Sequence, residues 1–475
     1  MIRTRFAPSP TGFMHIGGVR TALFAYLIAK QNNGKFILRI EDTDVNRYVE
    51  GATQVIYDTL NDLGLNWDEG PDIGGDYGPY IQSERKDIYF EYAKKLIEQG
   101  DAYYCFCSDE RIENLKDSAR LAKKPYKYDG FCKSLTQEEI EQKIKTEKHV
   151  IRFKMPNTGV VSFIDEVYGE VRVNANELED LIIIKSDKMP TYNFANIIDD
   201  SLMKITHVIR GNEYLSSTPK YIKMYEALEF EVPKFIHLPI IKKDKDSDKK
   251  LSKRDNDATV ASLQKQGYLN KSIINMLALT GWSPESYNEI FSLNGLIKEF
   301  KISGIGKSNA VFDHNKLNWI NNHYIKEMDK DEYYDWIKKY LNQEYLNVYN
   351  EAELKEMVLL YQEQLHYGQQ INDLIKLFFE DSQISEEALI IIDDHQDVIK
   401  AFLDLITENE LWNEEIIKNI INEIKSRTGK KGKDLFMPIR IAGSHEIHGP
   451  ELIVMFKLLG RDKIIKNINE VLKEK

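Results

Sequence analysis

The start of the chain combines a strand pattern, a helix pattern and a second strand pattern. Apolar and polar residues alternate over Ile2–Phe6, which predicts a strand. Apolar residues then recur at helical spacing from residue 19 to residue 28, and Gly34 marks a helix end before a second strand at Lys35–Ile40. This order predicts a βαβ unit in a parallel sheet.

A loop rich in glycine and proline, FAPSPTGFMHIGG at Phe6–Gly18, joins the first strand to the helix. Parallel sheets bind ligands at the carboxyl ends of their strands, where this loop and the acidic Glu41–Asp44 segment would meet. Gly17 and Gly18 at a helix start let the backbone approach a phosphate, and His15 can donate a hydrogen bond to it. Taken alone, these residues also fit a tight turn with a capping histidine.

The rest of the chain changes character twice. Residues Asp101–Val150 hold the cysteines and many lysines without a clear sheet pattern, which is typical of an insertion. Strand patterns return over three stretches, Val150–Phe153, Val160–Phe163 and Asp180–Lys185. Ser262–Leu279 predicts one helix, and nearly every segment beyond Tyr324 has a helical pattern. The sequence therefore predicts an α/β N-terminal half and an all-α C-terminal half.

Composition narrows the class of protein. At 475 residues the chain is long enough for about two to five domains, and 42% hydrophobic residues suffice for buried cores. No apolar run approaches the roughly 18 residues of a membrane helix, and no apolar signal-peptide segment follows Arg3 and Arg5. Three cysteines argue against a disulfide framework, so we expect a cytoplasmic protein without a membrane partner.

The net charge of −12 by itself disfavours a nucleic-acid partner, because phosphate binding usually relies on lysine and arginine. Two basic clusters, Lys242–Arg254 and Lys425–Lys433, depart from that average. The first contains KLSKR at Lys250–Arg254, whose lysines are compact, flexible charges suited to a moving polyphosphate. Each cluster, taken alone, also fits a solvated loop.

Together, the glycine loop and the lysine loop resemble the two signature motifs of class I aminoacyl-tRNA synthetases. The HIGH motif corresponds to His15-Ile16-Gly17-Gly18, and the KMSKS motif to Lys250-Leu251-Ser252-Lys253-Arg254. Further stretches are similar to bacterial glutamyl-tRNA synthetases, in chain order RFAPSPTG, LRIEDTD, GPYIQSER, KSDKMPTYNFANIIDD, VIRGNEYLSSTP, FDHNKL and GKDLFMPIRIA. Because these stretches cover nearly the whole chain, the sequence as a whole resembles this family.

The resemblance implies a ligase that joins L-glutamate to ATP as glutamyl-adenylate and transfers the acyl group to the 3′ end of tRNA(Glu). The first step, attack at the α-phosphate, needs positioning and charge stabilisation more than a nucleophilic side chain. The catalytic residues would be His15, Lys250 and Lys253. Mg²⁺ would come with ATP, held mainly by phosphates and water. Enzymes of this family characteristically need tRNA for the activation step.

By the same resemblance, matching residues line the two substrate sites. The glutamate set is Arg5, Ala7, Ser9, Glu41, Tyr192, Asn196 and Arg210. The ATP set is His15, Gly17, Gly18, Glu213, Ile241, Lys250, Ser252 and Lys253. Glu41 would meet the substrate ammonium, and Arg5 or Arg210 the side-chain carboxylate, because arginine binds a planar carboxylate through two hydrogen bonds. Tyr192 and Asn196 alone also fit a helix turn with buried polar groups.

The cysteine spacing resembles a zinc site of some enzymes in this family. Cys105 and Cys107 are separated by one residue, and Cys132 follows. Zinc needs a fourth ligand, which in these relatives is a histidine two residues after the last cysteine or a tyrosine four residues before it. Those positions hold Ser134 and Tyr128, so the predicted ligands are Cys105, Cys107, Tyr128 and Cys132. The alternative is three reduced thiols at a site that has lost its metal.

The resemblance also predicts a domain plan. A Rossmann-type catalytic domain comprises residues 1–100 and 190–243, with a domain for the tRNA acceptor stem inserted at 101–189. A KMSKS and stem-contact domain at 244–325 leads to a helical anticodon-binding region at 326–475, in two subdomains split near residue 388. We expect a monomer that contacts single-stranded anticodon bases. The absence of arginine from Leu359–Gln370 leaves open whether glutamine tRNA is also charged.

Two other functions compete with this interpretation. A truncated paralogue that glutamylates a modified tRNA base lacks the anticodon-binding half, and the helical segments beyond Tyr324 argue against it. A non-catalytic tRNA-binding protein derived from a synthetase would be free to lose His15 or Lys253, and both are present.

Overall fold

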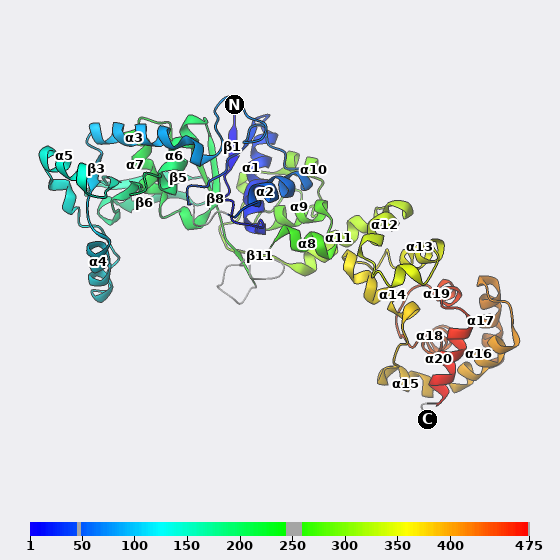
Figure 1. Ribbon diagram of the computed structural model, residues 1–475. Helices are drawn as coiled ribbons and strands as arrows, with labels where there is room; N and C mark the ends of the chain where they lie inside the picture. The colour runs from blue at the N-terminus through cyan, green and yellow to red at the C-terminus, as the bar shows by residue number, and fades with distance from the viewer. Residues whose placement is uncertain (45–48, 244–258, 474–475) are drawn as a thin grey trace. The chain divides into compact units, whose positions relative to one another are not determined.

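The computed structural model in Figure 1 describes residues 1–44, 49–243 and 259–473. The chain divides into two compact units, which are described separately. The N-terminal unit comprises Met1–Lys265 and Asn270–Leu317, and the C-terminal unit comprises Gln266–Leu269 and Asn318–Lys475. No helix among the described residues is long and apolar enough to cross a membrane.

The N-terminal unit is built on a mixed sheet with strand order β2-β1-β8-β9-β5-β6. These strands are β1 (Arg3–Phe6), β2 (Lys35–Leu38), β5 (Val160–Asp165), β6 (Gly169–Asn174), β8 (His207–Gly211) and β9 (Lys234–Leu238). All neighbours pair in parallel except β5 and β6, which form an antiparallel hairpin. The parallel pairing of β1 with β2 across helix α1 (Ile16–Gln31) confirms the predicted βαβ unit.

The segment expected to be an insertion contributes to two sheets. A separate antiparallel sheet contains β3 (Ala102–Cys105), β4 (Val150–Phe153) and β7 (Leu181–Ile184). The hairpin β5–β6 instead joins the central sheet, where Asp165 pairs with Phe235. Helix α4 (Asp109–Leu121) has no buried residue and stands apart from the strands in Figure 1. The predicted borders of the insertion at 101–189 stay a prediction.

The remaining elements of this unit are mostly helices. They are α2 (Ala52–Asp62), α3 (Lys86–Glu98), α5 (Gln137–Thr146), α6 (Tyr192–Leu202), α7 (Thr218–Ala227), α8 (Val260–Gln266), α9 (Asn270–Leu279) and α10 (Leu293–Glu299), with a short parallel pair of β10 (Ile241–Lys242) and β11 (Ala310–Val311). Helix α11 (His314–Lys326) begins in this unit, and its residues from Asn318 onwards belong to the C-terminal unit. The single helix predicted over Ser262–Leu279 is wrong, because α8 and α9 are separate. Gly267 interrupts them with φ of +95°, a conformation that favours glycine.

The C-terminal unit is helical throughout its described elements, as the sequence predicts. Its helices are α12 (Lys330–Ile337), α13 (Glu351–Leu359), α14 (Ile371–Phe379), α15 (Glu386–Asp393), α16 (Gln396–Glu408), α17 (Glu414–Thr428), α18 (Lys433–Ser444), α19 (Leu452–Leu459) and α20 (Arg461–Lys473). Local sequence explains their ends. Helix α17 begins with two glutamates, carries Lys425 and Arg427 in its last turn, and ends at Gly429 in the left-handed conformation.

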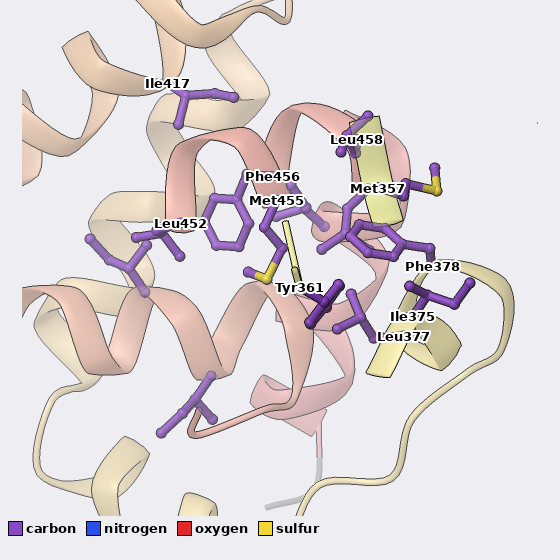
Figure 2. Close-up of a cluster of buried hydrophobic side chains, with 14 of the residues drawn as sticks. Met357, Tyr361, Ile375, Leu377, Phe378, Ile417, Leu452, Met455, Phe456 and Leu458 are labelled. Atoms are coloured by element: carbon purple, nitrogen blue, oxygen red, sulfur yellow. The ribbon is translucent and has the colours of Figure 1, made fainter. Parts of the chain in front are cut away.

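One apolar core runs through the C-terminal unit. Figure 2 shows side chains from α13, α14, α17 and α19 gathered together, among them Met357, Phe378 and Phe456. The ring of Phe456 also stacks on Phe402 of α16, with ring centres 5.7 Å apart. Because this core extends to both sides of residue 388, the predicted division into two subdomains stays a prediction.

Candidate functional site

A pocket of about 770 Å³ opens at the carboxyl ends of β1, β2 and β8. Its walls are formed by Arg5, Phe6, Ala7, Ser9, Pro10, Thr11, Gly18, Thr21, Glu41, Asp42, Thr43, Asp44, Lys185, Asp187, Pro190, Thr191, Tyr192, Ile209, Arg210, Gly211 and Tyr214. This is the edge of a parallel sheet where ligands are expected to bind. The volume fits a small-molecule substrate.

Six of the seven residues predicted to bind glutamate line this pocket: Arg5, Ala7, Ser9, Glu41, Tyr192 and Arg210. The seventh, Asn196, is buried in α6, and its side-chain amide donates to the carbonyl of Tyr192 at 2.9 Å. That contact is the alternative considered from the sequence, a buried polar group within a helix turn. The predicted contact of Asn196 with glutamate stays a prediction.

Arg5 is held by a carboxylate from a distant helix. Its Nε and Nη2 donate to the two carboxylate oxygens of Asp200 in α6, at 3.0 and 3.2 Å. Arg39 donates to the same carboxylate at 2.8 Å and to Glu41 at 3.1 Å. These four residues form a continuous buried ion network under the pocket. Burial would raise the pKa of Asp200, but Arg5 and Arg39 hold it below its usual value.

Asp199 anchors the other side of the same helix turn. Its carboxylate accepts hydrogen bonds from Arg85, Gln82 and Tyr89, at 2.7 to 3.0 Å. Arg39 completes the connection, with its Nε 3.7 Å from Asp199. The two aspartates therefore join α6 to strands β1 and β2 and to the segment before α3. Charged groups are rarely buried in this way unless they are paired.

Glu41 faces the pocket from the end of β2 with an altered acidity. Its side chain is buried, and burial raises its pKa to about 7 although Arg39 and Arg5 oppose this change. A buried carboxylate that is costly to keep charged gains the most from a cationic ligand. Perturbed carboxylates in clefts are typical of functional sites.

Arg210, at the carboxyl end of β8, differs from Arg5 in its partners. Its Nε donates to His237 Nε2 at 3.1 Å, and its Nη2 donates to the Thr218 hydroxyl at 2.7 Å. Its Nη1 is buried without a hydrogen-bond partner among the described residues. Aromatic rings of Tyr214 and Tyr221 lie 5.3 and 4.8 Å from the guanidinium carbon. The acceptors of these two hydrogen bonds, His237 and Thr218, are neutral, so the positive charge of Arg210 is available to an anionic ligand.

The predicted phosphate loop lies at the start of α1. His15 caps this helix, and its Nδ1 accepts a hydrogen bond from the backbone N–H of Gly17 at 3.0 Å. A neutral imidazole that accepts at Nδ1 carries its proton on Nε2, which makes Nε2 the donor of the ring. A side chain added at Gly18 would meet nothing within 4 Å, so the backbone is open on the side of the pocket.

The fold brings the region of the second motif to this loop. His15 forms an isolated antiparallel bridge with Thr259, the first described residue after the lysine loop. Lys250, Ser252 and Lys253 lie outside the described residues. The flanks of the two motifs thus meet, although the chain separates them widely.

The structure also places the other two residues of the predicted ATP set. Glu213 lies in the short turn Asn212–Tyr214, between the pocket residues Gly211 and Tyr214. Ile241 is buried in β10, shortly after β9. Their roles towards ATP stay predictions.

The four predicted zinc ligands come together at the end of β3. The sulfur atoms of Cys105, Cys107 and Cys132 lie within 4.8 Å of one another. The Tyr128 hydroxyl is 3.3 Å from the sulfur of Cys105 and 3.2 Å from that of Cys107. A turn at Gly130, with φ of +75°, brings Cys132 back towards β3. Three soft sulfur atoms and one phenolic oxygen form a compact set of four donors, the number that a tetrahedral zinc ion binds.

Several residues beside the pocket were not identified from the sequence. Asp200 and Asp199 hold the arginines, while His237 and Thr218 hold Arg210. Both aspartates lie in the stretch KSDKMPTYNFANIIDD, about one helical turn after Asn196. Asp200 pairs with Arg5 across 195 residues of chain and Asp199 pairs with Arg85 across 114, which local spacing does not reveal.

Comparisons with known proteins agree with the geometry. The family model described as "tRNA synthetases class I (E and Q), catalytic domain" matches residues 1–319, and a model of an anticodon binding domain matches residues 332–472. The glutamate–tRNA ligase of Clostridium novyi is 44% identical over 495 aligned residues, covering 100% of this chain and 98% of that protein. That of Clostridium acetobutylicum is 46% identical, covering 98% and 97%.

Solved structures give the same result. The glutamate tRNA ligase of Elizabethkingia meningosepticum, in complex with its amino acid, has a TM-score of 0.86 at 35% identity and 99% coverage of both chains. The glutamate–tRNA synthetase of Elizabethkingia anophelis has a TM-score of 0.89 at the same identity and coverage. Since the catalytic model spans more than half of the chain and the similarity extends over its length, the protein belongs to the class I tRNA synthetases of the E and Q family.

Proposed function

We propose that the protein is a glutamate–tRNA ligase that activates L-glutamate with ATP and transfers the glutamyl group to the 3′ end of tRNA(Glu). The observation that carries this proposal is the pairing of Glu41 and Arg210 in one pocket. Glu41 supplies a carboxylate for the substrate ammonium. Arg210 supplies a cation for the side-chain carboxylate of the substrate, because its own hydrogen-bond acceptors are neutral. The similarity over the full length to proteins of this name supports the same substrate.

In this proposal Arg5 has a supporting role in glutamate binding. Its guanidinium lines the pocket, but two of its nitrogens are bound to Asp200 and a third donates to the Ile209 carbonyl. Arg210 is therefore the better receptor for the side-chain carboxylate of the two arginines predicted from the sequence. Ala7, Ser9 and Tyr192 complete the walls around the amino acid.

The chemistry proceeds in two displacements. A carboxylate oxygen of glutamate bonds to the α-phosphorus of ATP, and the bond from that phosphorus to the bridging oxygen breaks, releasing pyrophosphate. A hydroxyl of the terminal tRNA ribose then attacks the acyl carbon, and AMP leaves. His15 Nε2 and the open backbone at Gly18 would contact the phosphates at the start of α1. The predicted Lys250, Ser252 and Lys253 would complete the ATP site, with Mg²⁺ bound chiefly by the phosphates.

The domain plan predicted from the sequence supplies the tRNA contacts of this proposal. The segment 101–189 would bind the acceptor stem, and the C-terminal unit would bind the anticodon. Lys425, Arg427, Lys430, Lys431 and Lys433 lie at the end of α17 and the start of α18, where they would meet phosphates. The predicted monomeric state and cytoplasmic location stay predictions.

Zinc is proposed as a structural ion at Cys105, Cys107, Tyr128 and Cys132. It would tie the end of β3 to the turn that carries Cys132, and it would take no part in the reaction. Metal analysis of protein purified without chelator should find about one equivalent of zinc. The variant Tyr128→Phe should lose zinc faster to a chelator while keeping its three thiols. Less than about a tenth of an equivalent in the unsubstituted protein would contradict the site.

Pyrophosphate exchange tests the whole proposal. The protein should exchange labelled pyrophosphate into ATP when glutamate and tRNA(Glu) are both present, and glutamine should not replace glutamate. Exchange that does not need tRNA would contradict the close assignment to glutamate–tRNA ligases but keep the family. No exchange with tRNA present would favour the non-catalytic tRNA-binding protein. Attachment of glutamate to a modified base, instead of the 3′ end, would favour the paralogue.

A further inference from the structure

Three neighbouring strands of the central sheet align a buried chain of polar side chains that ends at the pocket. Arg210 of β8 and His237 of β9 are partners in the parallel register, and Asp165 is the last residue of β5. His237 Nδ1 lies 2.6 Å from Asp165 Oδ2, and Arg210 Nε donates to His237 Nε2 at 3.1 Å. The three side chains are 5% exposed or less. The hydrogen-bonded chain therefore runs from the Asp165 carboxylate through the His237 imidazole to the Arg210 guanidinium, which lines the pocket.

The contacts assign one protonation state to His237. Arginine has only N–H donors, so His237 Nε2 must accept from Arg210. The ring proton then sits on Nδ1 and is donated to Asp165, which fixes both the tautomer and the ring plane. Burial lowers the pKa of His237, and so does the charge of Arg210, although Asp165 opposes them. The ring between Asp165 and Arg210 is neutral.

Asp165 is itself fixed by the hairpin that leaves the sheet. Its Oδ1 accepts from the backbone N–H groups of Val167 and Tyr168, at 3.0 and 2.9 Å, in the turn between β5 and β6. Its Oδ2 accepts from the backbone N–H of His237 at 3.2 Å as well as from the ring. The carboxylate therefore has four acceptor contacts and little freedom to move.

The chain of contacts keeps Arg210 positioned without neutralising it. The acceptors of its Nε and Nη2 are an imidazole nitrogen and the Thr218 hydroxyl, whereas those of Arg5 include the carboxylate of Asp200. A direct ion pair with Asp165 would cancel the charge that a substrate carboxylate needs. Asp165 fixes the orientation of the imidazole, and the imidazole in turn orients Arg210. The imidazole also keeps the carboxylate of Asp165 apart from the guanidinium of Arg210. An amide ligand would gain less, because its NH₂ group would face another donor.

We propose that Asp165 and His237 are positioning residues that hold Arg210 as a receptor for an anionic amino-acid side chain, so that they set the preference for glutamate over glutamine. This inference rests on the proposed function. It extends the set of residues that determine glutamate binding from the pocket wall to His237 and Asp165, on the neighbouring strands β9 and β5. His237 acts through Arg210 and does not itself line the pocket.

Two substitutions of His237 separate the hydrogen bond that its ring makes to Asp165 from the one that it accepts from Arg210. His237→Asn keeps an amide near the position of Nδ1, able to donate to Asp165, but it leaves the Nε of Arg210 without its acceptor. His237→Gln reaches further and can place an amide oxygen near the position of Nε2. The measurement is tRNA-dependent pyrophosphate exchange, giving KM for glutamate, KM for ATP and kcat, with the inhibition constant of glutamine as competitor. Thermal unfolding is recorded for every variant.

The proposal expects the asparagine variant to raise KM for glutamate by at least about tenfold, while KM for ATP stays within about twofold. The glutamine inhibition constant should change less than KM for glutamate. The glutamine variant should recover most of the lost affinity. His207→Asn is the matched control, since His207 lies at the opposite end of β8 and its ring contacts Thr206. It should leave KM for glutamate unchanged.

Other outcomes overturn the inference. Equal KM for glutamate in the unsubstituted protein and the asparagine variant would do so. A parallel rise of both KM values with a lower unfolding temperature would mean a structural role only. Should His237→Asn not fold, Thr218→Val carries the test, because it removes the acceptor of Arg210 Nη2 and should also raise KM for glutamate selectively. An unsubstituted protein without glutamate-dependent exchange would refute the proposed function itself.

Discussion

The two units differ in the kinds of side chain that they bury. Beside the pocket, the N-terminal unit buries Arg5, Arg39 and Arg85 together with Glu41, Asp199 and Asp200. In the described part of the C-terminal unit, the buried polar residues are Asn321, Ser444, His445 and Asn467, and none is an aspartate, glutamate, lysine or arginine. The core there is otherwise apolar.

This difference shows where the fold trades stability for recognition. Removing charges from water costs several kcal/mol for each ion, and pairing offsets that cost only when the geometry is good. An apolar core of the same size has no such cost. The N-terminal unit therefore concentrates costly groups where a ligand is handled, while the C-terminal unit has a core suited to a stable helical scaffold. Substitutions in the two interiors should consequently have different effects.

The largest expected effect is on activity, in the N-terminal unit. Arg210→Met should lower kcat/KM for glutamate activation by roughly a thousandfold, since truncating one side of a buried charged contact costs several kcal/mol. Its unfolding temperature should stay the same or rise, because the substitution removes a buried cation with neutral partners. Pyrophosphate exchange and thermal unfolding provide the two measurements.

Arg172→Met is the matched control for this prediction. Arg172 is exposed on β6 of the same sheet and pairs with Glu170 at 3.7 Å. Its substitution should change neither measurement. An Arg210 variant that keeps its activity would mean that another group, with Arg5 the first candidate, binds the side-chain carboxylate.

The second effect is on stability, in the C-terminal unit. Phe456→Ala should lower the free energy of unfolding of this unit by about 3–5 kcal/mol, because it leaves a cavity in a close-packed core. The ring is fully buried and stacks on Phe402. Urea unfolding followed by circular dichroism measures the change. Phe436→Ala, at a phenylalanine of α18 that is 48% exposed, is the control and should change it little. Equal losses in both variants would contradict the proposed core.

The smallest effect is a pH dependence that arises from Glu41. With a pKa of about 7, Glu41 is mostly protonated at pH 6 and mostly ionised at pH 8. Because the substrate ammonium needs the ionised form, KM for glutamate should fall by about tenfold between these two pH values. Glu41→Gln should remove this dependence and raise KM at pH 8. A pH-independent KM in the unsubstituted protein would contradict the role of Glu41.

The same pKa makes an opposite prediction for stability. A folded-state pKa above the ordinary value of 4.5 means that the native protein holds a proton that the unfolded chain has lost between about pH 4.5 and 7. The contribution of Glu41 to the free energy of unfolding therefore falls as pH rises through this window. This stabilising contribution stays lost above pH 7. Raising the pH therefore strengthens glutamate binding and lowers the stability of the protein.

The candidate site was predictable where local sequence is sufficient. The strands at Ile2–Phe6 and Lys35–Ile40 and the helix between them follow from apolar periodicity, and the observed pairing of β1 with β2 confirms them. The single helix over Ser262–Leu279 failed, because periodicity continues across Gly267 although its backbone does not. Asn196 was predicted to bind glutamate; its amide nitrogen donates within α6, and its contact with the substrate stays a prediction.

What the sequence by itself determined is the set of chemical groups and their order along the chain. A βαβ start with its glycine loop, the motif series and a helical second half all depend on spacing and residue type, which local physics translates directly. Only the tertiary structure decided the state of each group. Asp200 neutralises Arg5 from 195 residues away, whereas Arg210 meets the neutral His237 on the next strand. Burial and pairing set the free energy of a charge, and both depend on neighbours that the fold supplies.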